Sequence, residues 1–260
     1  MLGSLPCGAC IATVPGNTGE EAGRIGSAHV LAGFRDPTKD PLPGMVLKGI
    51  RRTHGVVQRR ALPLDPRRLR QAWNIFSSLR STRDKALVLL GFSTAFRRSE
   101  LVGLDIDDLC WSERGLTIRL RNSKTDQERA SRLVAVPWAG AGPCAALAVM
   151  HWIEASKIKQ GGLFRSINAQ GTLGERLSAQ SVNGIVKTLV SLEGMPVDRI
   201  SAHSLRAGFV TAAVDAGVDL ASIQKQTGHA SLDALARYIR GVDPFVQNAN
   251  AKIGSSGHFN

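Results

Sequence analysis

The spacing of apolar residues changes along the chain and divides it into a short first unit and a longer second one. Residues 1–21 are rich in Gly, Ala and Thr without a clear period, so we expect them to be poorly ordered. Two stretches within residues 22–58, AGRIGSAHVLAGF and MVLKGIRRTHG, show helical spacing on either side of the turn-forming segment DPTKDPLPG. The pattern predicts a small helical unit and linker over 22–58, followed by a larger unit over 59–260.

In the larger unit the helical period dominates. Asp65-Pro66 places a capping residue before a proline suited to the first helical position, which predicts a helix to about Ser78, and a second helix is expected from about Thr82. GLTIRLR and RLVAVPW alternate apolar and polar residues, so they predict a β-hairpin joined by RNSKTDQERAS. The fold class is therefore mainly α with a small β-hairpin or sheet. Further helices are expected at about 143–158, 178–192, 203–216, 219–226, 231–240 and 244–252.

The net charge of the chain indicates the kind of partner that it binds. The chain has 260 residues, 43% of them hydrophobic, which is enough for a sizeable core. It carries 33 basic and 21 acidic residues, a formal net charge of +12. Such a balance favours a polyanionic partner, and nucleic acid is the first candidate, although ribosomal and membrane-surface proteins share it.

Membrane and metal functions receive little support from the composition. No apolar run reaches the roughly 18 residues of a membrane helix, and the N-terminus lacks the basic segment of a signal peptide. Cys7 and Cys10 form a CxxC pair without a second pair at zinc-site spacing, so we interpret them as free thiols of a reducing compartment. We expect a cytoplasmic protein without a metal or cofactor.

Tyr238 is the only tyrosine, in the basic segment LDALARYIRG. A tyrosine in a helix is usually a packing residue, but the residues before this one suggest chemistry. His229 precedes it in TGHASLDALARY, where Gly228 can end one helix and Ser231 can cap the next. His229 is thus predicted to lie in the turn that presents the tyrosine helix.

Two further motifs each place an arginine three residues from a polar partner. His203 and Arg206 in AHSLRAGF share a helix face, and a guanidinium beside an imidazole suits a phosphate. Arg97 and Glu100 in FRRSELVGL form a simple i,i+3 ion pair, or else the Glu100 carboxylate orients the Arg97 guanidinium toward a ligand. Lys124, in the hairpin loop, is either a solvated side chain or a proton donor that reaches a nearby groove.

Taken in order, AFRRSEL, the hairpin lysine, HSLRAGF and TGHASLDALARY resemble the conserved boxes of the tyrosine recombinase family, of lambda-integrase, Xer and Cre type. The resemblance covers about residues 60–252 and is specific, because all of these elements agree in order and spacing. Residues 22–54 resemble only the end of the helical core-binding domain that precedes the catalytic domain in that family.

The resemblance implies an enzyme that cuts and rejoins DNA without metal or ATP. Tyr238 would attack the phosphodiester and form a 3′-phosphotyrosine, leaving a free 5′-hydroxyl. Arg97 and Arg206 would clamp the phosphate, with Glu100 as support. His203 is the candidate base, His229 a phosphate contact and Lys124 the candidate acid, although the residues leave the division of proton transfers among these three open.

The expected partner is double-stranded DNA. A neighbouring protomer is the second expected partner, because the segment DPFVQNANAKIG could supply the helix that links the subunits of a homotetramer on paired sites. Phosphate contacts are expected from a cluster of arginines around the linker, namely Arg51, Arg52, Arg59, Arg60, Arg67 and Arg68.

Three alternatives remain beside the recombinase. Only about sixty residues precede the catalytic unit, fewer than in the family, so the chain could be a truncated, weak or silent DNA-binding remnant. A type IB topoisomerase has similar chemistry, but the sequences of the motifs HSLRAGF and GHASL favour a recombinase. A basic helical scaffold or an RNA-binding protein would call for interleaved aromatic residues, and the aromatic content is only 5%. All of the expected catalytic residues are present, which favours an active enzyme.

Overall fold

The computed structural model describes residues 18–54, 61–65, 78–121, 132–140 and 142–229, together with Arg68, Ser231, Leu232 and Leu235; within the first range, the side chains of residues 18–22, 51 and 54 are not described. The chain forms two compact units, Met1–Arg60 and Ala61–Asn260. Of residues 1–21, which we expected to be poorly ordered, 18–21 are helical and 1–17 lie outside the described residues. The CxxC pair and most of the expected helices near 65–78, 231–240 and 244–252 lie outside them too.

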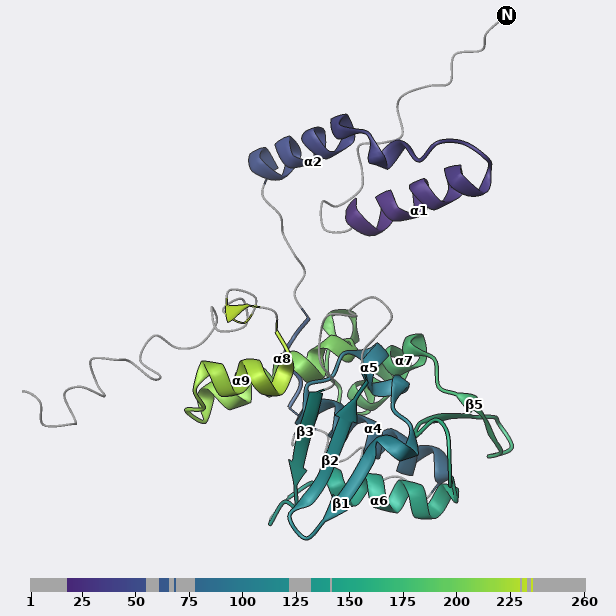
Figure 1. Ribbon diagram of the computed structural model, residues 1–260, viewed down its shortest axis with the longest axis vertical. Helices are drawn as coiled ribbons and strands as arrows, with labels where there is room; N and C mark the ends of the chain where they lie inside the picture. The colour runs from purple at the N-terminus through teal and green to yellow at the C-terminus, as the bar shows by residue number, and fades with distance from the viewer. Residues whose placement is uncertain are drawn as a thin grey trace, which may run out of the picture. The chain divides into compact units, whose positions relative to one another are not determined.

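The first unit contains two helices, α1 (Thr18–Leu31) and α2 (Pro41–His54), with the short 3₁₀ helix η1 (Pro37–Lys39) between them (Figure 1). Asp36 caps η1 because its Oδ1 atom accepts hydrogen bonds from the backbone N and the hydroxyl of Thr38, at 2.9 and 2.7 Å. The first part of the predicted turn DPTKDPLPG is thus a capped 3₁₀ turn, whereas its last four residues already belong to α2, which begins at Pro41.

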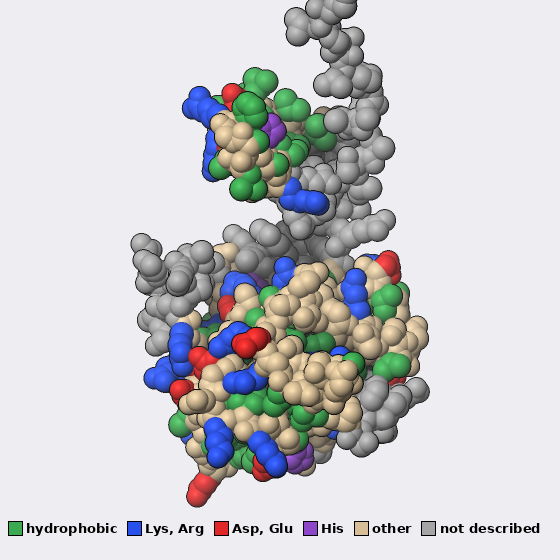
Figure 2. Space-filling view, turned by 90° about the vertical axis from the view of Figure 1, so that its right-hand side faces the viewer, with side chains coloured by type: hydrophobic (Ala, Val, Ile, Leu, Met, Phe, Trp, Pro, Cys, Tyr) green, Lys and Arg blue, Asp and Glu red, His purple; other side chains and the backbone are tan. Residues whose placement is uncertain are grey.

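Apolar side chains of this unit are largely exposed. Leu31, Phe34 and Met45 retain 88%, 69% and 69% of their accessible surface, and Figure 2 shows hydrophobic groups at the surface of this unit. The described residues of the first unit therefore provide almost no hydrophobic core.

The second unit is mainly helical with two small antiparallel sheets, which confirms the predicted fold class (Figure 1). Its helices are α4 (Leu79–Thr94), α5 (Arg98–Gly103), α6 (Ala145–Ser156), α7 (Ala179–Leu192), α8 (Ala202–Asp215) and α9 (Leu220–Thr227), with the 3₁₀ turns η3 (Ile106–Asp108) and η4 (Val197–Arg199). One sheet has the order β1 (Leu109–Ser112), β2 (Gly115–Leu120) and β3 (Arg132–Pro137), and the other pairs β4 (Arg165–Ile167) with β5 (Leu173–Arg176).

The predicted hairpin is confirmed as β2 and β3, which pair from Gly115↔Pro137 to Leu120↔Arg132. Strands β1, β4 and β5 were not predicted, because three or four residues are too few to show an alternating pattern. Helix α4 begins before the expected Thr82, since Ser78 and Ser81 form a capping box at its N-terminus.

Helix α4 is the centre of the core. Its Leu87 and Leu90 are fully buried, and the helix contacts α6, α8 and the sheet at β3. Trp152 of α6 is fully buried too, and its Nε1–H donates to the carbonyl of Leu163 at 2.8 Å. A helix that is apolar on several sides fits this central position.

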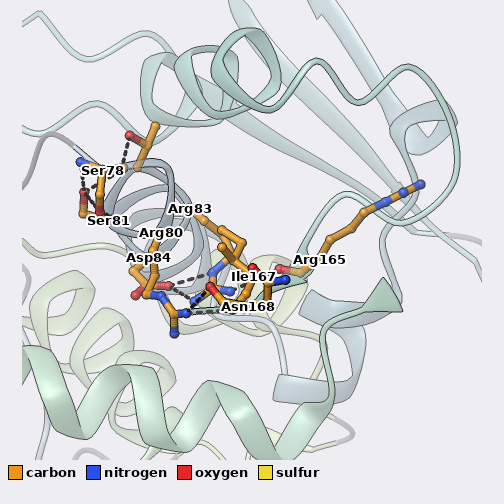
Figure 3. Close-up of polar contacts among 9 residues, drawn as sticks. Ser78, Arg80, Ser81, Arg83, Asp84, Arg165, Ile167 and Asn168 are labelled. Carbon is orange, nitrogen blue, oxygen red and sulfur yellow. Dashed lines mark hydrogen bonds and ion pairs between the residues drawn. The ribbon is translucent and has the colours of Figure 1, made fainter. Parts of the chain in front are cut away.

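Arginines of α4 fasten the small β4–β5 sheet to the core (Figure 3). Arg83 is 4% exposed; it binds the Asp84 Oδ1 atom through Nε and Nη2 at 2.8 and 2.6 Å, and donates to the Arg165 carbonyl at 3.1 Å. Arg80 donates to the carbonyl of Ile167 at 2.7 Å. Burial raises the pKa of Asp84, and the charge of Arg83 opposes that rise. These contacts hold the β4–β5 sheet against α4, and none of them involves a predicted catalytic residue.

The segment 61–65 lies along α8, the helix that carries His203 and Arg206. The backbone N–H of Leu64 donates to the Ser204 carbonyl at 2.9 Å, and the Leu64 side chain is fully buried. Gly208 permits this approach, because a Cβ there would come within 2.7 Å of the carbonyl carbon of Leu64. The glycine of the HSLRAGF motif thus serves packing.

We expect Gly208→Ala to destabilise the second unit by about 1–3 kcal/mol, the usual cost of an added carbon in a packed interior. Gly184→Ala is the matched control, because Gly184 lies in α7 with open space around it. That change should stabilise the fold by about 0.5–1 kcal/mol through helix propensity. Urea unfolding of both variants measures the difference, and equal stabilities would contradict the packing role.

Candidate active site

The first arginine box lies where α4 gives way to α5. Ala95 ends α4 with a left-handed backbone, φ 54°, and Arg97 stands at the N-cap of α5. Glu100 accepts hydrogen bonds from the Arg97 backbone N–H and from its Nη1, both at 2.7 Å. The ion pair expected from the i,i+3 spacing is present, and the same carboxylate holds the half-exposed guanidinium of Arg97 in one orientation.

Arg206 is buried, with 2% of its surface exposed. Its Nη1 atom donates to the carbonyl of Ala95 at 2.6 Å and to the carbonyl of Thr227 at 2.7 Å. Ala95 is two residues before Arg97, and Thr227 is two residues before His229. One guanidinium therefore links α8 to the C-terminal ends of α4 and α9, each of which lies two residues before a predicted phosphate-binding residue.

His203 is in the first turn of α8, whose cap is Ser201: the Ser201 hydroxyl accepts from the His203 backbone N–H at 3.2 Å. His203 is exposed to solvent. Its neighbours still lower its pKa, through partial desolvation first and then through the positive charges of Arg206 and Arg97. The neutral form, which can accept a proton, is favoured in the free protein.

His229 follows the C-cap Gly228, which ends α9 with φ +67°. Burial lowers the pKa of His229 to about 4, and the positive charges of Arg206 and Arg97 contribute next. The Nδ1 atom lies 2.6 Å from the Thr227 hydroxyl, which is also 2.7 Å from the Ile223 carbonyl. Because that carbonyl can only accept, the hydroxyl proton points to it and the imidazole proton resides on Nδ1. The Nε2 atom of the neutral ring is then a proton acceptor.

Arg132 joins these residues, although the sequence patterns did not single it out. Its Cζ lies 5.8 Å from the centre of the Phe96 ring, and its guanidinium packs against Gly228. It is also among the positive charges that lower the pKa of His229. Its only sequence signal is its place at the start of the strand RLVAVP, which says nothing about its tertiary contacts.

The hairpin loop that contains Lys124 is anchored where it leaves β2. Arg121, just beyond β2, donates from Nε to the Oδ1 of buried Asp108 at 2.6 Å and from Nη1 to the Oδ2 of Asp105 at 3.1 Å. Asp105 also accepts from Arg176 Nη2 at 2.5 Å. This network fixes the start of the loop against η3.

The remaining predicted residues divide into described and undescribed ones. Leu235, three positions before Tyr238, is fully buried with Val210 and Ile223 and so anchors the start of the tyrosine segment between α8 and α9. Arg52 and Arg68 are exposed. Outside the described residues lie Tyr238, Lys124, Arg59, Arg60 and Arg67, together with the side chain of Arg51.

Comparison with known proteins decides the family, since residues 64–243 match the phage integrase family. The chain belongs to this family. It is 37% identical over 232 residues to an integrase/recombinase XerD homologue of Selenomonas ruminantium, covering 86% of this chain and 68% of that protein. It is 34% identical over 165 residues to tyrosine recombinase XerC of Syntrophus aciditrophicus, covering 60% of this chain and 48% of that protein, so it spans about half of that relative's length.

Solved structures of integrases and recombinases show the same fold. The Tn1549 transposon integrase in complex with a circular intermediate DNA has a TM-score of 0.57 at 16% identity, covering 93% of this chain and 79% of that one. The XerH site-specific recombinase in its post-cleavage complex has a TM-score of 0.55 at 20% identity, covering 76% of this chain and 53% of that one. The predicted family and enzyme class, a tyrosine-type DNA recombinase, are confirmed by the family match and the relatives.

Metal and membrane functions can be examined over the described residues. They contain no group of three or more His, Cys, Asp or Glu side chains that could hold a metal ion. Within the same part of the chain, no helix combines the length and apolar character of a membrane span.

The lowered pKa of His229 predicts a pH effect on stability. Its value is about 4 in the folded chain, against 6.5 ordinarily, so folding favours the neutral ring. The associated stability is complete above about pH 6.5 and declines as the pH falls toward 4. We expect NMR titration to show the His229 ring titrating well below its value in urea, with its neutral proton on Nδ1. Similar pKa values in the folded and unfolded chain would contradict the burial of this ring.

Proposed function

We propose that this chain cleaves and rejoins double-stranded DNA at specific sites through a covalent 3′-phosphotyrosine at Tyr238. The observation that carries the proposal is the position of Arg206. Its buried guanidinium donates to the carbonyls of Ala95 and Thr227, two residues before Arg97 and His229 respectively, which supports the convergence of these residues on one phosphate. An enzyme that binds a phosphodiester needs such convergent donors.

The proposed reaction exchanges one phosphorus–oxygen bond for another and needs no cofactor. The Tyr238 oxygen attacks phosphorus, the bond from phosphorus to the 5′-oxygen breaks, and the leaving oxygen takes a proton. Arg97 and Arg206 offset the charge that gathers on the nonbridging oxygens. The tyrosine proton passes to a neutral imidazole, for which His203 is our first candidate, and Lys124 protonates the leaving oxygen.

His229 has a role that follows from its ring state. In the free chain its Nε2 accepts rather than donates, because the ring is neutral and Nδ1 carries the proton. A bound phosphate adds negative charge beside the ring and raises its pKa, which favours a protonated ring able to donate to a nonbridging oxygen. We therefore assign His229 to the phosphate, with its proton acquired on DNA binding.

DNA is the proposed partner, bound chiefly through phosphates. Figure 2 shows Lys and Arg side chains on the face of the second unit in view, with fewer Asp and Glu. The arginines around the linker, among them Arg52 at the end of α2 and Arg68, both exposed, are proposed to add contacts. We further propose a homotetramer on paired sites, linked by the segment 244–252, and a cytoplasmic, nucleoid-associated protein.

The test is a search for the covalent intermediate. The full chain is incubated with a library of nicked duplexes of random sequence, and protein–DNA adducts are recovered under denaturing conditions and sequenced. A recombinase yields adducts enriched in one motif. A topoisomerase-like enzyme would form adducts without a shared motif, and a silent DNA-binding remnant would bind the library without any adduct.

Adduct formation should proceed at an unchanged rate in excess EDTA. Arginines supply the positive charge that metal ions provide in two-metal nucleases, so no divalent cation is needed to stabilise the transition state. Single-turnover rates with EDTA and with Mg²⁺ should agree within about twofold. A strict requirement for Mg²⁺ would point to a different mechanism.

A further inference from the structure

We propose that Arg132 is a third arginine of the phosphate site, contacting the same phosphate as Arg97 and Arg206. The inference rests on the proposed function and adds an arginine from the hairpin to the two arginines that stand at α5 and on α8. It follows from the juxtaposition of the Arg132 guanidinium with the residue before Arg97 and the residue before His229.

The backbone places Arg132 at the loop end of the paired strands β2 and β3. It is the first residue of β3 and pairs with Leu120, the last residue of β2. The side chain extends from there to the turn at Gly228, and its Nη1 atom is buried. Its Cζ lies 5.8 Å from the centre of the Phe96 ring, which is consistent with a cation–π contact.

Gly228 provides the space for this arrangement. A Cβ at this position would come within 2.8 Å of the Arg132 Cζ and would overlap its Nη1. The same glycine has φ +67°, a conformation that other residues adopt at a cost. The glycine before His229 thus satisfies two demands, the end of α9 and the close approach of a guanidinium.

Electrostatics favour a ligand over a purely structural role. Arg132, Arg97 and Arg206 all act on His229 as positive charges that lower its pKa. Like charges that lie close together in a partly desolvated site repel one another and destabilise the folded protein when no ligand is bound. A bound anion offsets this repulsion.

The experiment uses inorganic phosphate as the probe, so it needs no knowledge of the target sequence. Phosphate is titrated into the full chain near pH 7, and its affinity is read from the ring signals of His203 and His229. Arg132→Met removes the charge and keeps an apolar stem on Phe96, while Arg132→Lys keeps the charge. Arg119→Met is the matched control, because Arg119 is an exposed arginine on β2 of the same hairpin.

We expect Arg132→Met to weaken phosphate binding about tenfold, as the loss of a charge-assisted contact does. Arg132→Lys should stay within about threefold of the parent, and Arg119→Met within about twofold. Adduct formation on the duplex recovered from the library should slow at least about tenfold in Arg132→Met alone.

Several results would overturn the proposal. Parental phosphate affinity in Arg132→Met would remove Arg132 from the site, and equal weakening by Arg119→Met would reduce the effect to general charge. An Arg132→Met chain that fails to fold, beside an Arg132→Lys chain that folds, would assign the positive charge at position 132 to structure. A parent that binds phosphate at both histidines but forms no adduct would refute the proposed function and leave Arg132 in the anion site.

Discussion

Replacing Tyr238 with phenylalanine is expected to abolish the covalent adduct and leave DNA affinity within about twofold of the parent. The change removes the phenolic oxygen, the proposed nucleophile, and keeps the ring. Buried Leu235 continues to anchor the start of the segment. Adduct formation on a denaturing gel and equilibrium DNA binding are measured side by side.

The composition makes this test unusually direct. Tyr238 is the only tyrosine in the chain, so any phosphotyrosine released by hydrolysis of the adduct must come from it. The parent adduct should yield phosphotyrosine and no phosphoserine. An adduct formed by Tyr238→Phe, or a linkage through serine, would refute the nucleophile assignment.

Arg206→Ala should slow single-turnover cleavage by two to three orders of magnitude, since losing one preorganised donor to a developing oxyanion costs about 2.7–4 kcal/mol. The variant should also be less stable. The Ala95 and Thr227 carbonyls both lose a buried donor, and an unsatisfied buried group costs about 1–3 kcal/mol. Cleavage rate and thermal unfolding are measured on the same preparation.

Arg83→Ala separates these two effects. Arg83 is as deeply buried as Arg206, at 4% against 2% exposure, and it also donates to a distant backbone carbonyl. We expect this variant to lose stability yet cleave within about threefold of the parent well below its melting temperature. Equal slowing of cleavage in both variants would mean that Arg206 acts only through the fold, and an Arg206→Ala rate within tenfold of the parent would refute the phosphate clamp.

The local elements of this protein were predictable because their signals lie within a few residues. Helices α6, α7, α8 and α9 match the predicted ranges within about two residues, since helical periodicity and capping residues such as Ser178 and Asp219 are local. The hairpin β2–β3 matches for the same reason. Strands β1, β4 and β5 depend instead on partners that only the folded chain brings alongside them.

The candidate site shows the same division. The sequence motifs alone identified Arg97, His203, Arg206 and His229 as candidates, because residue types at fixed spacing can be recognised without a structure. Only the tertiary structure revealed that Arg206 is buried and bonded to Ala95, 111 residues away in the chain. It also brought Arg132 to Gly228, since contacts between distant segments arise from packing and leave no periodic trace in the sequence.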